Sequence, residues 1–484
     1  MNLLPWLVAL PLMAALAVFL SPIRWRASGS LFGAVCLGFI SIYTLAEVIM
    51  KGVLIHALAG WAVPLGIRLQ ADGFAAGMVV LTALVTMLCA VQAATYLRGK
   101  PEEEGFWPLL WFMWAALNSI WLSADLFNLF VGVELLGLTA VGLVALNGSA
   151  QSLAAAMRYL LATLLGSFFF LIGVVLIYAA LGSLALADLA GHGAGMPTVL
   201  IALVLMTFGL GLKAALFPLH GWLPPAHGGA ALTPVSALLS ALVIKAALYI
   251  LIRLWITLDV TVLPVPLAWI LGLMGSGAIL WGGWMALRQN RLKNLVAYST
   301  VAQVGYLFLF FPLVTGTAAT AAVLAWDATV LMLISHAFAK AGMFLAAGNL
   351  VFAIGSPRIA DLAGVCRFRP FSLLSFGVAG VSLAGLPPSG GFNAKWLLIQ
   401  SALAGGQWFW LPVLILGGLL SAAYVIRVLN HSFVEGPVRD HFHAPPLSQE
   451  LAAFLLASAS LVIGLVSQAP LTWLRIGVPF AGGG

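Results

Sequence analysis

Charged residues are scarce in this sequence. They make up 7% of its 484 residues, whereas hydrophobic residues make up 63%. Soluble domains carry about a quarter charged residues, so this composition excludes an ordinary water-soluble protein and indicates one that is integral to a membrane. Cysteine is also rare. Cys36, Cys89 and Cys366 lie far apart without C-x-x-C spacing, which argues against an iron–sulfur cluster, a structural zinc site or a disulfide framework. We therefore expect no cofactor and no metal in this chain.

The charges that are present follow a topological pattern. The net charge is +7 and the pI is near 9.5, but no basic patch with interleaved aromatic residues lies outside the apolar runs, so no nucleic-acid partner is expected. If the N-terminus faces outward, the outer loops hold only Lys51, Arg68, Arg253 and Arg475. The inner loops then hold Arg24, Arg26, Arg98, Lys100, Arg158, Arg288, Arg291, Lys293, Arg358, Arg367, Arg369, Arg427 and Arg439. This excess predicts that both termini face outward across a bacterial-type inner membrane.

Apolar runs of about twenty residues, the length that crosses a bilayer as a helix, follow one another almost without a pause. They predict an all-α polytopic membrane protein, surrounded by lipid, with about fourteen transmembrane helices. The first run lacks the basic start and the cleavage site of a signal peptide, so we count it as a span. The runs cover residues 2–21, 29–49, 74–96, 106–122, 126–146, 157–180, 197–219, 232–257, 262–284, 293–312, 318–351, 371–402, 407–429 and 449–475.

Four lysines and one glutamate fall well within these runs, namely Lys213, Lys245, Lys340, Lys395 and Glu134. Each costs about 2.5–3.5 kcal/mol at a helix centre on insertion scales, so such residues are rare and usually functional. The alternative is snorkelling, in which a long side chain near a helix end reaches the headgroups. In general, burial lowers the pKa of an ammonium group and raises that of a carboxyl group, and a partner of opposite sign reverses both shifts. Buried groups of this kind can therefore take up and release protons.

Two of these lysines lie beside predicted helix breaks. Lys213 is followed by three prolines and Lys395 is preceded by two, at positions 218, 224, 225, 387 and 388. Irregular backbone at membrane depth has to line a hydrated cavity or be satisfied by protein, and discontinuous helices mark transport sites. A simple proline kink in a packed helix is the alternative. Two such breaks, each next to a buried lysine, favour a transport function.

The two breaks also suggest an internal duplication. Transporter folds often contain inverted repeats whose corresponding helices are interrupted, and two units of five spans necessarily run in opposite directions. We therefore predict two inverted five-helix repeats. The expected organisation is an N-terminal group of three helices (1–105), a first repeat (106–257), a second repeat (258–430) and a cytoplasmic loop with the final helix (431–484).

Histidines and aspartates supply further candidates. An imidazole titrates close to neutrality, and His336 precedes Lys340 by four residues, on the same helix face. Its alternative is a histidine that is merely hydrogen-bonded to a neighbour, and it is the one histidine that we expect to be deeply buried. His220 and His227 are placed on the inner side, where protons would enter or leave. A zinc site is not expected there, since the spacing of the two histidines does not fit zinc and a third ligand is lacking. Asp327 is a secondary candidate for a coupling carboxylate, or a cap or polar lining. Asp125 is interpreted as a helix N-cap.

Six stretches of the chain together resemble a known family. They are "DLFNLFVGVELLGL", "KAALFPLHGWLPPAH", "LTPVSALLSALVIKAALYILIRL", "RLKNLVAYSTVAQVGY", "HAFAKAGMFLAAG" and "GLPPSGGFNAK". In this order, from about residue 106 to residue 430, they resemble the proton-conducting antiporter-like subunits. Such subunits are shared by respiratory complex I, membrane-bound hydrogenases and Mrp-type sodium/proton antiporters.

This resemblance implies fourteen helices with two inverted repeats, and roles for particular residues. It implies that Glu134 and Lys213 form the family's glutamate–lysine pair, that Lys245 is the middle lysine of a hydrophilic axis, that His336 is the bridging histidine and that Lys395 is the exit-side residue. Lysine at this last position is similar to the D subunit of Mrp antiporters and some complex I subunits. The stretch "HAFAKA" is closer to the hydrogenase and large-subunit versions, which leaves the parent complex open.

We therefore expect a proton-translocating subunit of a multisubunit complex. Its partners would be other membrane subunits, together with a redox module of flavin and iron–sulfur proteins or a sodium/proton exchange system, so its status as part of an enzyme stays open. Three alternatives remain. The chain could supply proton-motive force to a partner that takes up inorganic carbon or another ion. It could be a stand-alone secondary transporter. It could also be an oxidoreductase subunit with its own cofactor, which would need paired ligands on facing spans.

Overall fold

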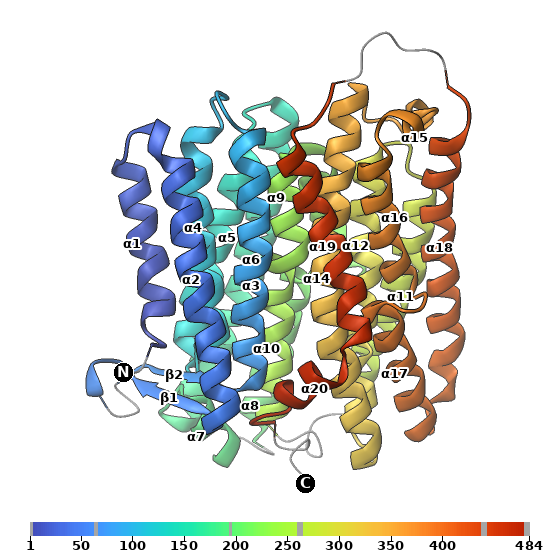
Figure 1. The fold of residues 1–484 in the computed structure, drawn as a ribbon. Helices are drawn as coiled ribbons and strands as arrows, with labels where there is room; N and C mark the ends of the chain where they lie inside the picture. Colours follow the sequence, from blue (N-terminus) through green and yellow to red (C-terminus); the bar gives the residue numbers. More distant parts are fainter. Residues whose placement is uncertain (1–2, 62–65, 193–195, 259–264, 437–442, 479–484) are drawn as a thin grey trace.

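The fold is a bundle of long helices that run roughly up and down past one another (Figure 1). A computed structural model describes residues 3–61, 66–192, 196–258, 265–436 and 443–478. Arg439, in the polar stretch 431–450, lies outside these residues. Within them, ten helices are long and apolar enough to cross a membrane. The chain is thus a polytopic membrane protein, and helices are the expected solution because lipid offers the backbone no hydrogen-bond partners.

The N-terminal part of the bundle is built from eight helices. They are α1 (Trp6–Leu20), α2 (Ile23–Lys51), α3 (Gly73–Tyr96), α4 (Glu103–Leu122), α5 (Leu126–Ala145), α6 (Ala150–Leu181), α7 (Leu186–His192) and α8 (Pro197–Lys213). Side-chain caps set three of their starts. Asp72 accepts from the amide of Ala75 at α3, Asp125 accepts from Asn128 at α5, and a serine caps α6. The interpretation of Asp125 as an N-cap is confirmed.

The remaining helices complete the bundle. They are α9 (Thr233–Leu238), α10 (Ile244–Thr257), α11 (Val265–Leu287), α12 (Leu292–Phe308), α13 (Phe310–Val314), α14 (Ala319–Ile354), α15 (Val365–Phe368), α16 (Pro370–Ala384), α17 (Gly390–Ala404), α18 (Leu411–Phe433), α19 (Leu447–Leu465) and α20 (Gln468–Leu474). The apolar run 449–475 is therefore two helices, since the chain leaves helical geometry at Val466. Short 3-10 turns lie at Leu58–Gly60, Leu219–Trp222, Ile359–Leu362 and Trp408–Trp410.

The expectation of a wholly helical chain is wrong at one place. Between α2 and α3, strand β1 (Leu54–Ala57) pairs antiparallel with β2 (Arg68–Ala71), so that Leu54 lies opposite Ala71. Exposed and less exposed side chains alternate along β1, and buried ones alternate along β2. This is the pattern of a hairpin with one covered face. The segment is too short to cross a bilayer, so it packs against the end of the bundle instead.

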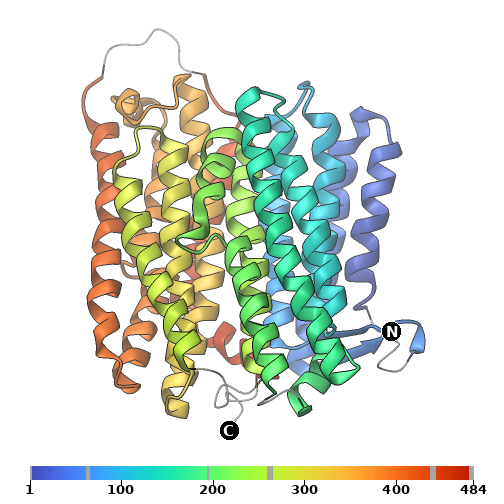
Figure 2. The same ribbon diagram turned by 180° about the vertical axis from the view of Figure 1, so that it is seen from behind.

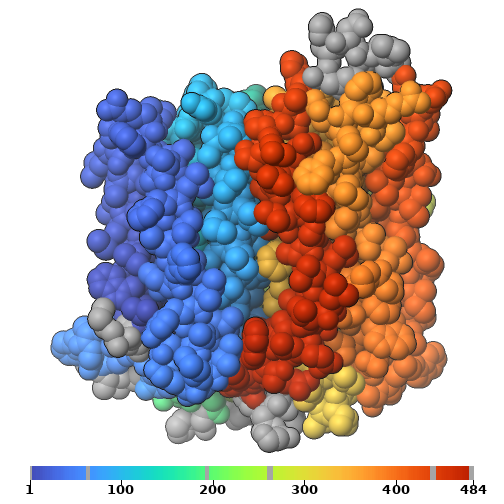
Figure 3. Space-filling view, viewed as in Figure 1, coloured from blue at the N-terminus to red at the C-terminus, as the bar shows by residue number. Residues whose placement is uncertain are grey.

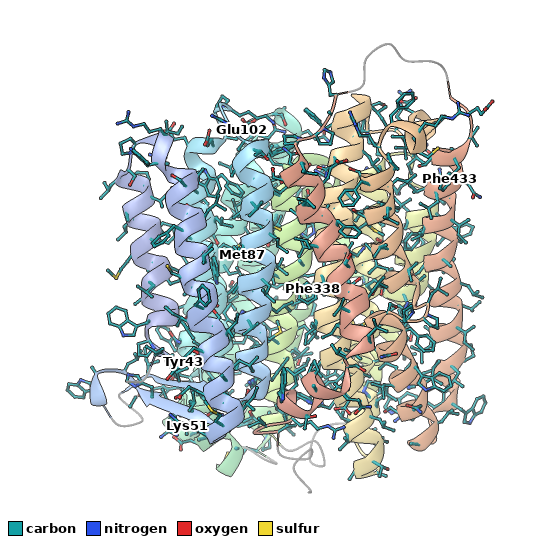
Figure 4. The ribbon with its side chains drawn as sticks, in the orientation of Figure 1. Tyr43, Lys51, Met87, Glu102, Phe338 and Phe433 are labelled. Atoms are coloured by element: carbon teal, nitrogen blue, oxygen red, sulfur yellow. The ribbon has the colours of Figure 1, made fainter. Side chains whose placement is uncertain are left out.

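The two ends of the bundle differ, and they are named here by what they carry. The hairpin end has β1, β2, α7 and α20, and Lys51 lies there (Figures 1 and 4). The α15 end lies opposite, and Glu102 and Phe433 lie toward it (Figure 4). The loops that were predicted to be inner, such as the α3–α4 connection, lie at the α15 end.

Three spans form the centre. The most apolar windows of Thr233–Thr257 and Ala319–Ile354 are wholly buried, and that of Leu292–Val314 is nearly so. A helix that is apolar on every side belongs in the interior. The windows of Ile23–Lys51, Trp408–Phe433 and Leu447–Leu465 are only about one-third buried or less, as expected for helices that face lipid. Figure 3 shows part of α14 in yellow between α3 and α19, above an apolar groove of about 140 Å³ that Phe338 helps to line.

Glycine pairs let two helix pairs approach closely, one in each half of the bundle. A Cβ on Gly209 of α8 would lie 2.3 Å from the carbonyl oxygen of Gly166 on α6. A Cβ on Gly305 of α12 would lie 2.3 Å from the carbonyl oxygen of Gly275 on α11. Small residues at such crossings are typical of helices that associate in membranes. The pairs fix the position of α8 and α12, which both carry lysines.

Helices break at both expected places. After α8 the chain passes through a 3-10 turn and a π-helical turn, Pro225–Ala230, before α9 begins. Figure 2 shows this green segment inside the bundle rather than beyond its end. A second π-helical turn, Leu239–Val243, joins α9 to α10. Between α16 and α17 the chain turns at Gly385, whose φ is +79°, and α17 restarts with Ser389 as its N-cap.

Candidate functional site

The C-terminal end of α8 places Lys213 beside a carboxylate. Its Nζ lies 3.5 Å from Oε1 of Glu134 on α5 and donates a 2.7 Å hydrogen bond to Thr163 on α6. Ser167, one turn further along α6, donates to the same Glu134 oxygen. The Lys213 side chain is 7% exposed and that of Glu134 is 27% exposed. The glutamate and lysine that were expected to pair therefore lie next to each other, at the edge of the bundle rather than at its centre.

Lys245 has no carboxylate partner among the described residues. Its Nζ donates to two backbone carbonyls, at 3.1 Å to Ser240 and 2.5 Å to Ala241. Both belong to the π-helical turn that precedes α10. A π turn shifts the regular hydrogen-bond pattern and often occurs at functional sites. Here it directs carbonyl dipoles toward an ammonium group that is 1% exposed, so the irregular backbone replaces part of the solvation that water would give.

Lys340 is held by the neighbouring helix. It lies on α14, is fully buried, and donates to the carbonyl of Val296 at 3.0 Å and to the hydroxyl of Ser299 on α12. The Thr300 hydroxyl donates to the same Val296 carbonyl. The Val296 carbonyl is thus shared between Lys340 and Thr300, and the Ser299 hydroxyl supplies the ammonium group with a second acceptor.

Lys395 is held by the second helix break. Its Nζ donates to the carbonyls of Leu383, at 2.7 Å, and Ala384, at 3.3 Å. These are the last two residues of α16, and helix ends leave carbonyls without an intrahelical donor. The ring of Tyr306 lies 4.4 Å from the same nitrogen, a cation–π contact. A Cβ on Gly385 would lie 2.7 Å from Cδ of Lys395, so glycine here serves both the turn and the lysine.

A fifth lysine was missed. Lys293 was counted among the inner-loop charges, but it is half-buried on α12 and donates at 2.6 Å to the carbonyl of Ala231. That carbonyl directly follows the π turn between the first break and α9. The charge pattern alone assigned Lys293 to a loop because it lies at the start of a span. The sequence signal that could have identified Lys293 as a buried residue was its position in "RLKNLVAYST", one of the stretches that resemble the family.

Two histidines lie among these lysines. His336 is 1% exposed and lies within electrostatic range of Lys245, Lys340 and Lys395. His227 is fully buried and feels the charges of Lys293, Lys340 and Lys245. The expectation that His336 alone is deeply buried is therefore wrong. The π turn carries His227 into the bundle, where its ring packs edge-on against Trp222 at 5.9 Å.

Neither histidine has a hydrogen bond from its ring nitrogens to another described residue. The side-chain oxygens of Asn294, Gln303 and Tyr306 are likewise buried without a described partner. Buried polar atoms are nearly always paired with protein or with water, and internal waters bind where two or more such atoms meet. These atoms are therefore suited to hold water between the lysines.

A small cavity connects the first pair to the central helix. It has a volume of about 20 Å³ and is lined by Tyr159, Thr163 and Lys213 on one side and by Val243, Ala246 and Ala247 on the other. This is about the space of one water molecule. The last three residues flank Lys245 in the chain. The residues predicted to carry protons, Glu134, Lys213, Lys245, His336 and Lys395, are called the row below. The structure pairs the first two and places His336 near Lys245, Lys340 and Lys395.

Snorkelling does not describe these lysines. Lys245, Lys340 and Lys395 are 1%, 0% and 7% exposed, and each ammonium group is hydrogen-bonded to protein acceptors rather than placed beyond the helix ends.

Two secondary candidates, His220 and Asp327, have other surroundings. The ring of His220 is half-buried and stacks on Phe217 at 5.5 Å.

Asp327 lies at the hairpin end. Its carboxylate accepts two hydrogen bonds from the guanidinium of Arg475, one of them 2.9 Å from Nε. Hydrogen bonding to Asp327 raises the pKa of Arg475, so this arginine stays charged. Arg475 had been counted as a free outer charge. The pair favours a structural role for Asp327 over a coupling role, because its carboxylate is already neutralised.

The fold and its buried charges define a class of protein: a polytopic membrane protein with ionisable side chains inside its helix bundle. Residues 123–421, more than half of the chain, match the family described as NADH:quinone oxidoreductase/Mrp antiporter, TM. The chain belongs to this family. It is an antiporter-like membrane subunit of the kind found in complex I and Mrp-type complexes.

Relatives from several assemblies are similar over most of their length. NADH-quinone oxidoreductase subunit N of Desulforudis audaxviator is 38% identical over 399 residues, which are 81% of this chain and 78% of that one. The D subunit of the Na⁺/H⁺ antiporter of Alkalihalophilus pseudofirmus is 29% identical over 83% of this chain and 80% of that one. In the Mrp complex from Dietzia sp. DQ12-45-1b, a chain matches with a TM-score of 0.89 and 27% identity, covering 98% of this chain and 96% of that chain.

Proposed function

We propose that this chain moves protons laterally through the membrane interior, along Glu134, Lys213, Lys245, His336 and Lys395, with Lys340 beside the last steps. Protons pass between these groups through bound water. The movement is coupled to a redox reaction or to ion exchange in a neighbouring subunit. The chain alone does no useful work, because nothing in the row supplies energy.

One observation carries this proposal. Lys245 and Lys395, near the middle and at one end of the row, are held by carbonyls that helix breaks or π turns have freed. A buried ammonium group is expensive, and mispaired carbonyls are also expensive. A membrane protein that needed only stability would place leucine at such positions on regular helices. The combination is explained if the groups must gain and lose protons in place.

The finer topology is part of the proposal. Fourteen spans, arranged as repeats 106–257 and 258–430 of opposite orientation, place Lys213 and Lys395 at corresponding breaks. The hairpin end faces outward, since the positive-inside pattern assigns the loops at the α15 end to the inner side. His227 and Lys293, at the α9 break, then connect the row to that inner side.

Partners follow from the relatives. The first two relatives are named as parts of an NADH-quinone oxidoreductase and of a Na⁺/H⁺ antiporter, so we propose that this chain assembles with other membrane subunits. The driving partner is either a redox module with flavin and iron–sulfur proteins or an exchange system for sodium. Mass spectrometry of the proteins that co-purify with the chain separates these cases.

Replacement of Lys245 by alanine tests the row. We expect Lys245→Ala to abolish coupled proton transport in membrane vesicles that carry the assembled complex, measured with a pH-sensitive dye. Lys51→Ala is the matched control, since Lys51 is exposed and bonds only Glu47, one turn away. Blue-native electrophoresis confirms equal assembly. Transport at the normal rate in Lys245→Ala would refute the relay.

A further inference from the structure

A buried ion pair lies on the same helix as Lys245 but outside the row. Arg253 donates from Nη2 to Oδ1 of Asp72 at 2.6 Å, and from Nη1 to the other carboxylate oxygen. Asp72 is fully buried and Arg253 has a side chain 12% exposed. Arg253 had been counted as an outer-loop charge. Its position inside the bundle needs an explanation beyond topology.

The pair borders a polar cavity at the hairpin end. The cavity has a volume of about 210 Å³ and is lined, among the described residues, by Asp72, Arg253, Tyr249, Gln70 and Ser123 together with residues of α7 and α10. A space of this size holds several water molecules. Eight residues of helix, about 12 Å, separate Arg253 from Lys245. Water at the hairpin end therefore comes close to the proposed proton row.

Only Tyr249 lies between them on this helix face. Lys245, Tyr249 and Arg253 are spaced four residues apart, so they share one side of α10. The Tyr249 hydroxyl accepts from Nε of Arg253 at 2.9 Å and donates to the carbonyl of Trp121 at 2.6 Å. Lys245 turns the other way, since its ammonium group bonds carbonyls on the N-terminal side of its own position. The row and the cavity thus adjoin without a hydrogen bond between them.

We propose that Arg253 is a fixed positive charge that seals the proton row against the cavity at the hairpin end. This inference rests on the proposed function. A guanidinium does not release its proton in proteins, so Arg253 cannot relay, and its charge repels an incoming proton. Arginines close water-filled pores to protons in the same physical way. The seal forces protons at Lys245 to continue toward His336 instead of leaving the membrane.

The surroundings hold the charge in place. Asp72 Oδ1 also accepts a hydrogen bond from the amide of Ala75 at 2.9 Å, so both carboxylate oxygens have hydrogen-bond donors. The guanidinium lies over the rings of Phe74, at 5.3 Å, and Tyr249, at 4.9 Å. The C-terminal segment covers the carboxylate, because Gly73 donates to the carbonyl of Ile476 at 3.0 Å. The contacts of Arg253 with Phe74 and Tyr249 do not involve Asp72, so they keep the guanidinium here when the carboxylate is replaced.

A leak measurement tests the seal. A pH gradient is imposed on vesicles that carry the assembled complex, with no driving substrate, and its decay is followed with a dye. We expect Arg253→Gln to speed the decay by about threefold or more. The leak should disappear in Arg253→Gln/Lys245→Ala, since it passes through Lys245. Asp72→Asn breaks the same pair but leaves the arginine charge, so its vesicles should hold the gradient like the native complex.

Other outcomes overturn the proposal. The arginine charge is not the barrier if the pH gradient decays in Arg253→Gln as slowly as in the native complex. The same follows if it decays in Asp72→Asn as fast as in Arg253→Gln. A fall in driven transport without a leak would instead make this region an exit route. Arg253→Met, which keeps side-chain length against Phe74, replaces the glutamine variant if the latter does not assemble. Loss of transport in Lys245→Ala alone remains the separate test of the row, so the two proposals can fail independently.

Discussion

The two lysines beside the main helix breaks have different partners. Lys213 lies 3.5 Å from the carboxylate of Glu134 and bonds a threonine hydroxyl. Lys395 bonds two free carbonyls and faces the ring of Tyr306. One ammonium group is thus balanced by a full negative charge, and the other only by dipoles.

The difference separates two steps of proton transfer. When Lys213 gives up its proton, the carboxylate of Glu134 is left behind in a half-buried place, so the charge of the pair changes from zero to negative. When Lys395 gives up its proton, a buried charge disappears and nothing unpaired remains. In the proposed relay, the first half therefore holds a proton until the pair separates, and the second half passes it on.

Lys395→Ala is the strongest test of this comparison between the two lysines. Removal of the ammonium group at the second break should reduce coupled transport by about a hundredfold or more, in the range that positioned proton-transfer groups contribute. The rate of dye-reported acidification in vesicles, divided by the amount of assembled complex, measures the effect. Undiminished transport would show that protons do not pass this break.

Glu134→Gln tests the other half and should have a smaller effect. The amide keeps the contact with Ser167 and Lys213 but cannot supply a negative charge. We expect transport to fall by about threefold to tenfold, because the proton can still reach Lys213. Glu134→Asp, with its charge restored, should recover part of the rate. A loss as complete as in Lys395→Ala would mean that protons reach Lys213 only through this carboxylate.

The glycine crossings offer a comparison of stability between the halves. Gly209→Ala and Gly305→Ala each force a Cβ against a backbone carbonyl at 2.3 Å, and overpacking of this kind costs about 1–3 kcal/mol. Thermal unfolding of the detergent-solubilised complex should start at a lower temperature in both. Gly29→Ala is the control, because a Cβ there meets nothing within 4 Å. Unchanged unfolding in either variant would show that its helices can move apart freely.

Asp327→Asn should have the smallest effect. Its partner Arg475 has a side chain 39% exposed, and partly exposed ion pairs contribute about 0–1 kcal/mol. Because the pair lies outside the row, we expect transport within about twofold of the native rate. The same vesicle assay measures it. A loss comparable to that in Glu134→Gln would restore Asp327 as a coupling carboxylate and extend the row toward the hairpin end.

Hydropathy predicted most of the spans because every segment that crosses lipid must be apolar. Charged residues within such segments, such as Lys245 and Lys395, were therefore easy to identify. Hydropathy did not predict the hairpin, whose strands are short and only partly covered. The positive-inside charge count misplaced Lys293 and Arg253. A basic residue near a span end can turn outward to the headgroups or inward to a partner, and the choice depends on neighbours distant in sequence, here Ala231 and Asp72.

Burial of His227 was missed for a related reason. The prolines around it predicted a break in the helix, but they did not predict that the broken segment would lie inside the bundle. The π turn that carries it packs against α6 and α12, and a Cβ on Gly228 would lie 2.7 Å from Oδ1 of Asn294, so its surroundings are set by tertiary packing. The pairing of Glu134 with Lys213 was accessible only through the family resemblance, since the two residues lie on separate helices.

Lys245→Arg tests the central claim most directly. Arginine keeps a positive charge in the middle of the row but does not release its proton. If protons reside in turn on Lys245, the assembled Lys245→Arg complex should show no coupled proton transport in the vesicle assay. Transport at the native rate by this variant would show that a fixed charge is enough at this position, and would contradict the account.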